Sequence, residues 1–135
     1  MSPEQIEKVQ SSFARVEPIA DQAAALFYGR LFEQNPGFRR LFKGDLQRQG
    51  GMLMATLALA VKNLHQPERI LSAVQELGRR HVGYGVTAAD YAPVGEALIW
   101  TLEQGLGAHF TTDVRAAWVA AYRLLSGVMV QAAEG

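Results

Sequence analysis

One histidine of this sequence falls on an apolar helical face, and two interpretations of it are open. Val74, Leu77 and His81 are spaced by three and four residues, which places their side chains on one face of an α-helix. His81 is therefore expected to point inward. It is either a core histidine hydrogen-bonded to a neighbour or a ligand to a metal ion or haem iron, because neutral imidazole is a common ligand of both.

The spacing around His81 disfavours a metal site made of side chains alone. Such a site on a helix pairs the histidine with a second ligand one turn away, and His81 has no partner at H-x-x-E, H-x-x-x-H or E-x-x-H spacing. Haem demands less of the chain, because the porphyrin supplies four of the iron ligands. Among the metal-based interpretations, a lone inward histidine therefore fits haem best.

Two further polar side chains continue apolar faces. Tyr28 lies midway between Ala24 and Phe32 at intervals of four, and Gln49 stands one turn before Leu53. Tyr28 is either a core tyrosine whose hydroxyl reaches a carbonyl or a donor to a bound ligand. Gln49 alone would be a solvated residue at a helix start.

The other aromatic and histidine residues give weaker signals. Phe42 and Tyr91, taken alone, indicate core packing and a contact at a helix start. His65 precedes a Gln-Pro pair and His109 lies in a loop, so both are expected to be exposed. The sequence shows no Ser-His-Asp arrangement, inward carboxylate pair or phosphate-binding glycine loop.

The composition excludes several classes of function. The 135 residues carry 13 basic and 13 acidic side chains and no cysteine. The balanced charge lacks the basic footprint of a nucleic-acid-binding protein, and the missing cysteines exclude disulfides, thiolate catalysis and cysteine-ligated metals. The longest apolar run, Met52 to Val61, is too short to span a membrane. With no signal peptide at the N-terminus, a soluble, cytoplasmic protein is expected.

Helical periodicity runs through the whole chain. Apolar residues recur at steps of three and four, and no segment alternates with a period of two. The break Lys43-Gly44-Asp45 and several Pro and Gly residues separate the segments. The expected helices are about 3–17, 19–34, 36–42, 46–65, 67–83, 88–105 and 112–130. Residues 1–135 are therefore predicted to form one all-α domain of six or seven helices.

These residues, in this order, resemble the globin family. The chain is most similar to single-domain bacterial haemoglobins and to the globin domain of flavohaemoglobins, and the resemblance covers its whole length. The segments that carry it are Leu26-Phe27-Tyr28-Gly29-Arg30-Leu31-Phe32, Asn35-Pro36 through Leu41-Phe42, Gln49 to Leu53, Leu77-Gly78-Arg79-Arg80-His81, Asp90-Tyr91-Ala92-Pro93-Val94-Gly95 and Ala117-Trp118 to Tyr122. The resemblance implies a globin fold around a haem pocket.

The resemblance also implies a role for each candidate residue. His81 is expected to be the proximal ligand of a pentacoordinate iron in haem b. Tyr28 and Gln49 are expected to form the distal polar pair, where dioxygen, carbon monoxide or nitric oxide binds. Two donors would stabilise polar dioxygen over nearly apolar carbon monoxide. The other expected contacts with haem are Phe42, Leu53, Tyr91, Val94 and Leu98.

Two positions depart from the family pattern. Flavohaemoglobins place a glutamate of the last helix near the proximal histidine, whereas the matching position here holds Ala133, and Glu134 comes one residue late. One residue rotates a helix by about 100°, so the second ring nitrogen of His81 is expected to bond a backbone carbonyl. The pair Gly50-Gly51 is expected to leave Gln49 loosely held.

By this resemblance the protein is expected to bind dioxygen reversibly, as in oxygen transport. Oxidation of nitric oxide to nitrate is a conditional second activity, because it needs a reductase; the sequence contains no dinucleotide-binding unit, so a separate reductase is expected. The alternatives are a haem-based oxygen or redox sensor module, an oxygen-delivery protein without catalytic turnover, and a haem-free helical interaction protein.

Overall fold

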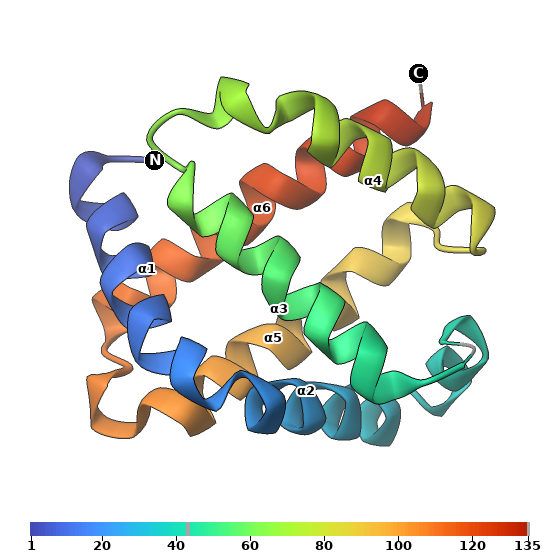
Figure 1. Cartoon of the computed structure of the whole chain (residues 1–135), viewed down its shortest axis with the longest axis horizontal. Coiled ribbons are helices and arrows are strands. Elements are labelled where there is room, and N and C mark those ends of the chain that lie inside the picture. Colours follow the sequence, from blue (N-terminus) through green and yellow to red (C-terminus); the bar gives the residue numbers. More distant parts are fainter. Residues whose placement is uncertain (43, 135) are drawn as a thin grey trace.

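The computed structural model describes residues 1–42 and 44–134, which form six α-helices joined by short 3₁₀ helices (Figure 1). These ranges contain no strand, and the predicted all-α fold is confirmed. Lys43, in the predicted polar break, and Gly135 lie outside the described residues. The α-helices are α1 (Pro3–Val16), α2 (Ala20–Gln34), α3 (Leu46–Lys62), α4 (Leu71–Gly83), α5 (Tyr91–Leu106) and α6 (Thr112–Glu134). The 3₁₀ helices are η1 (Glu17–Ile19), η2 (Pro36–Leu41), η3 (Pro67–Arg69), η4 (Ala88–Asp90) and η5 (Gly107–His109).

Local sequence signals begin and end these helices. At the start of α1 the Gln5 N–H donates to the Ser2 hydroxyl and the Ser2 N–H donates to the Gln5 side chain, both at 3.2 Å. At the start of α3 the Asp45 carboxylate accepts the Gln47 N–H at 3.0 Å. Gly107 follows α5 with a φ of 53°, a conformation that favours glycine.

Four segments differ from the expected ones. Those expected at 67–83 and 88–105 each begin as a 3₁₀ helix, η3 or η4, which precedes α4 or α5. The short helix expected at 36–42 is the 3₁₀ helix η2, which begins at Pro36. Helix α3 ends at Lys62 rather than near residue 65. There the Asn63 side chain donates to the Leu59 carbonyl at 2.8 Å, and such local bonds compete with the continuing helix. The chain therefore turns toward η3 about one helical turn early.

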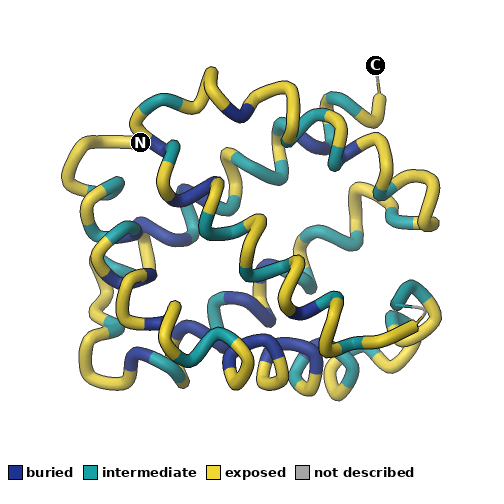
Figure 2. Tube along the Cα trace, viewed as in Figure 1, coloured by how far each residue is buried: buried dark blue, intermediate teal, exposed yellow. Residues whose placement is uncertain are grey.

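The core is organised around α2 and α6. Helix α6 packs along α4 and α1, and α2 packs on α3 and α5. Between α1 and α6 the Trp118 indole N–H donates to the Ser12 hydroxyl at 2.8 Å, and the Trp118 and Phe13 ring centroids lie 6.1 Å apart. Figure 2 shows buried residues concentrated along α2 and where the helices cross.

Helices α3 and α4 are consecutive but scarcely contact each other. They diverge from η3 like the arms of a V, and α5 passes behind α3 (Figure 1). Helix α3 rests on α2, whereas α4 rests on α6. Gly78 is the only buried residue among the thirteen of α4, all of which are described. Across the described ranges, no helix has the length and apolar character needed to cross a membrane.

Candidate functional site

His81 is half-buried on α4, and its ring is held at one nitrogen. The Nδ1 atom donates to the Leu77 carbonyl at 2.7 Å, one turn earlier in the helix. A carbonyl only accepts, so Nδ1 is the donor in this bond and Nε2 is the ring nitrogen left for another partner. Among the described residues, none hydrogen-bonds Nε2. The backbone partner expected from the sequence is therefore present, and the opposite side of the ring can accept a ligand.

Two tyrosine rings flank His81. The Tyr91 ring lies nearly parallel to the imidazole, with centroids 6.3 Å apart and 26° between the planes. The Tyr84 ring centroid lies 6.2 Å from that of His81. The carbonyl of Tyr91 accepts a hydrogen bond from the Tyr122 hydroxyl of α6 at 2.7 Å. These contacts connect the His81 ring to α5 and, through Tyr91, to α6.

The ring neighbours of His81 are tyrosines rather than carboxylates. Burial raises the pKa of Tyr91 above its ordinary 10.0, and the negative charge of Asp90 raises it further. Burial also raises the pKa of Tyr122. Glu134 is exposed at the end of α6, and in the described residues no carboxylate pairs with His81. The His81 ring is therefore held by a backbone carbonyl rather than by a carboxylate.

Tyr28 is buried in an aromatic cluster, with 6% of its surface exposed. Its ring lies edge-on to Phe42 at a centroid distance of 5.2 Å and stacks on Phe32 at 5.9 Å. The hydroxyl makes no hydrogen bond to a described residue. Because every buried side-chain oxygen or nitrogen of the described residues has a partner, this oxygen reaches accessible space. Burial raises the pKa of Tyr28 above 10.0, so this hydroxyl stays protonated and can donate.

Gly50 lets α3 cross α2 closely beside Tyr28. A Cβ at Gly50 would lie 2.8 Å from the Cβ of Ala24 and 3.6 Å from the Tyr28 ring. Gln49, the preceding residue, is half-buried within the first turns of α3. Gly50 therefore has a packing role that the sequence did not indicate, because its missing side chain allows the close crossing. A Cβ at Gly51 would meet no atom within 4 Å.

Replacing these adjacent glycines by alanine should change stability in opposite directions. In Gly50→Ala the new methyl would overlap Ala24, which should lower the free energy of unfolding by about 1–3 kcal/mol. In Gly51→Ala the methyl enters open space and favours the helix, which should raise that free energy by about 0.5–1 kcal/mol. Urea unfolding followed by circular dichroism measures both. A stabilising Gly50→Ala would contradict the close crossing.

The structure places the sequence-predicted residues in two groups. Tyr28 and Leu98 belong to a continuous buried apolar cluster, against which Phe42, Leu53 and Val94 pack. His81 lies against Tyr91, which begins the helix that also carries Val94 and Leu98. His65 and His109 are exposed, as expected. Within the described ranges, no three His, Asp or Glu side chains gather where they could hold a metal ion.

Sequence reasoning missed three residues in the surroundings of Tyr91 and His81. Gly78 approaches the backbone of Met129, and Gly95 lies against the ring of Tyr122. A signal for the glycines was present, because an isolated glycine inside a helical pattern costs about 1 kcal/mol and usually has a packing reason. Tyr122 gave no such signal, since its bond to Tyr91 joins residues far apart in the sequence.

Comparisons with known proteins agree with this arrangement. The family model described as Globin matches residues 25–129. The flavohemoprotein of Bordetella pertussis is 29% identical over 133 residues, covering 96% of this chain and 33% of that protein. The flavohemoprotein of Chromobacterium violaceum is 31% identical over 113 residues, covering 81% of this chain and 28% of that protein. The chain thus spans about a third of the length of these curated relatives.

Two solved structures share the fold. An engineered carbene transferase, made from a candidate nitric oxide dioxygenase of Rhodothermus marinus, superposes with a TM-score of 0.91 and 25% identity, covering 99% of this chain and 94% of that chain. A bacterial globin from Campylobacter jejuni superposes with a TM-score of 0.86 and 20% identity, covering 98% of this chain and 96% of that chain.

Proposed function

The chain belongs to the globin family, and on this basis we propose that residues 1–135 act as one domain that binds haem b between α3 and α4. When bound, haem supplies the iron at which dioxygen binds reversibly. The observation that carries the proposal is the state of the His81 ring. Its Nδ1 is bonded to the Leu77 carbonyl, which leaves Nε2 as the ring nitrogen that would hold the haem iron.

The helices on either side fit a flat apolar group. Leu53 and Leu57 of α3 and Leu77 of α4 are only half-buried, and the two helices scarcely contact each other. A porphyrin between them would cover these side chains, and each apolar Å² removed from water contributes about 25 cal/mol. Phe42, Tyr91, Val94 and Leu98 would add contacts from η2 and α5. A single histidine would suffice, because the porphyrin supplies four of the iron ligands.

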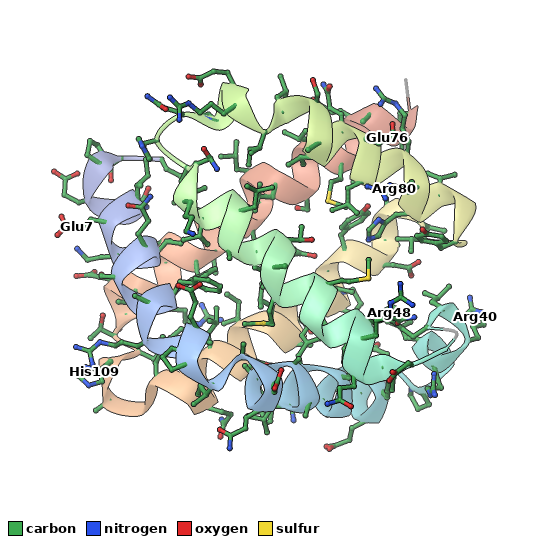
Figure 3. All side chains as sticks on the ribbon, in the orientation of Figure 1. Glu7, Arg40, Arg48, Glu76, Arg80 and His109 are labelled. Carbon is green, nitrogen blue, oxygen red and sulfur yellow. The ribbon has the colours of Figure 1, made fainter. Side chains whose placement is uncertain are left out.

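Two exposed cations, one on α3 and one on α4, would be available to the carboxylates of haem. Figure 3 shows Arg48 on α3 and Arg80 on α4 on the same side of the molecule, toward the open end of the V. Neither guanidinium pairs with a carboxylate among the described residues. Both are exposed, so ion pairs with the haem carboxylates would each contribute only about 0.2–1 kcal/mol.

Tyr28 would act as the main donor to dioxygen. Its ring lies within a packed aromatic cluster, and its hydroxyl is protonated and makes no hydrogen bond to a described residue. A donor that is already ordered loses little entropy on binding a ligand. Gln49, on α3, would be the second donor, and Leu53 would form the apolar part of this ligand site.

We further propose that the protein oxidises nitric oxide. The similarity to flavohemoproteins and to a candidate nitric oxide dioxygenase favours this activity. Nitric oxide, dioxygen and one electron combine to give nitrate, so turnover requires a reductase that supplies the electron. Without a reductase the same site would store or deliver dioxygen, or act as a sensor.

Rapid mixing of the haem-loaded, dioxygen-equilibrated protein with nitric oxide tests the proposal. The expected result is one nitrate per chain, formed with conversion of the iron to the ferric state, and renewed turnover only when a reductase and its electron donor are added. Reversible dioxygen binding without nitrate formation would contradict the enzymatic proposal and leave storage or delivery. Failure to bind dioxygen would contradict the function as a whole.

A further inference from the structure

Helices α4 and α6 meet backbone to backbone at Gly78. A Cβ at this position would lie 2.5 Å from the carbonyl oxygen and 2.7 Å from the Cα of Met129, and real Cβ atoms essentially never come closer than 3.0 Å. Helix α4 packs mainly on α6. Since Gly78 is also the one buried residue of α4, this contact is the point at which α4 is most firmly held.

Gly78 and His81 lie on neighbouring faces of α4. They are three residues apart, which corresponds to a turn of about 300° and places their side-chain directions roughly 60° apart. Leu77, whose carbonyl accepts the hydrogen bond from His81, directly precedes Gly78. Any displacement of α4 at Gly78 therefore moves both the His81 ring and the acceptor that orients it.

Helix α6 reaches His81 by a second route, through α5. A Cβ at Gly95 would lie 2.6 Å from Cε2 of Tyr122, so the Tyr122 ring packs directly on the α5 backbone. The Tyr122 hydroxyl donates to the Tyr91 carbonyl at 2.7 Å. The Tyr91 ring in turn lies nearly parallel to the imidazole of His81, 6.3 Å away.

We propose that α6 sets the position of the His81 ring through these two contacts, which makes Gly78 and Tyr122 positioning residues for the axial ligand of haem. The inference rests on the proposed function, since it concerns how the proposed ligand is aimed. Gly78 has no side chain that could bond to His81 or to haem. It acts by allowing α4 to lie directly on the backbone of Met129.

The contact at Gly78 leaves little room for adjustment. An alanine there must open the α4–α6 contact by about half an ångström before its Cβ clears the Met129 oxygen. The opposing atoms are backbone, which cannot rotate aside as a side chain can. Functional groups must be held within about 0.5 Å of their working position, and a misplacement of 1 Å can lower a reaction rate about a hundredfold. We therefore expect haem loss to be about tenfold faster in Gly78→Ala.

The experiment compares Gly78→Ala with the matched control Gly127→Ala in the haem-loaded full chain. Both variants add one methyl group to a helical glycine, but a Cβ at Gly127, on α6, would meet no atom within 4 Å. The first readout is the rate at which haem passes to an excess of a haem-scavenging protein. The second is the iron–histidine stretching band of the ferrous, ligand-free protein. Gly78→Ala should raise the rate about tenfold and shift the band, whereas Gly127→Ala should change neither.

A purely structural role for Gly78 would give a different pattern. The urea midpoint of the apoprotein would fall, while the stretching band of the loaded protein would stay unchanged, and that result would overturn the proposal. Tyr122→Phe provides a second test should Gly78→Ala not fold, because it keeps the ring over Gly95 and removes only the hydroxyl. It should broaden or shift the band and speed haem loss about threefold to tenfold. An unchanged band in Tyr122→Phe would also overturn the proposal.

Failure of the proposed function would be recognised separately, because the wild-type chain would then take up no haem. The positioning role still has a readout in the apoprotein, where nuclear magnetic resonance detects the contact between the ring protons of His81 and Tyr91. Gly78→Ala should weaken this contact and Gly127→Ala should preserve it. A contact equally strong in Gly78→Ala and wild type would count against positioning by α6.

Discussion

Replacing His81 by glycine should abolish stoichiometric haem retention while leaving the helical structure intact. His81 is half-buried, and the hydrogen bond from its ring is to a carbonyl of its own helix, so the fold depends little on it. The axial bond, in contrast, has no substitute among the apolar neighbours. Loss of a group that only orients a metal ligand lowers the affinity for the metal about 10–100-fold. Removal of the ligand itself should therefore lower the affinity for haem more than about a hundredfold. Added imidazole should restore both retention and the spectrum.

His109→Gly is the matched control for this experiment. His109 is exposed in η5, which contributes none of the proposed haem contacts. The haem-to-protein ratio after gel filtration, with and without imidazole, is the measurement. A core role for His81 would appear as a modest loss of stability with an unchanged ratio. A His81→Gly chain that kept one haem without imidazole would show that another residue is the ligand.

Replacing Tyr28 by phenylalanine should speed dioxygen release about tenfold to a hundredfold. The variant keeps the ring that packs on Phe32 and Phe42 and removes only the hydroxyl. A hydrogen bond to a polarised ligand stabilises it by about 1–3 kcal/mol, which corresponds to one to two decades in rate. Carbon monoxide gains little from such a donor, so its release should change far less. Stopped-flow dissociation of both gases gives the comparison.

Gln49→Leu should speed dioxygen release several-fold less than Tyr28→Phe does. Tyr28 is buried within an aromatic cluster, whereas Gln49 is half-buried near the start of α3. A larger effect of Gln49→Leu would reverse this ranking. It would indicate that the close crossing at Gly50 orders Gln49 more firmly than the aromatic cluster orders Tyr28. A carbon monoxide release rate raised as much as that of dioxygen would argue against a hydrogen bond altogether.

The pH dependence of dioxygen release provides an internal check on Tyr28. Burial raises the pKa of its hydroxyl above 10.0, so the donor is protonated below that pH and lost only above it. The release rate of the wild-type protein should therefore stay constant from neutral pH to about 10. It should then rise toward the rate of Tyr28→Phe, which should itself show no such step.

The order and type of the helices could be predicted because their signals are local. Ser2 and Gln5 form a reciprocal cap that is visible as a four-residue pattern, and Thr111 accepts from the Val114 N–H at the start of α6. The hydrogen bond from His81 to Leu77 is also local, since both residues lie on one helix. Because the sequence has no carboxylate at the expected position of the last helix, a backbone carbonyl could be predicted as the partner of the His81 ring.

The parts that could not be predicted depend on distances between helices. Gly50 and Gly51 are identical neighbours in the sequence, yet only Gly50 faces α2. The sequence shows that a glycine weakens a helix, but only the packed structure shows whether a second backbone occupies the space it leaves. The same holds for Gly78 against Met129 and for the hydroxyl of Tyr122, whose acceptor lies 31 residues away.

Titration of the apoprotein with haemin, followed by visible absorption, tests most directly whether the His81 neighbourhood is a haem site. Wild-type protein should develop an intense Soret band that rises linearly and breaks at one haem per chain, with quenching of tryptophan fluorescence at the same point. His81→Gly should show no such break until imidazole is added. A gradual rise without a break, or an identical titration for wild type and His81→Gly, would contradict haem binding through His81.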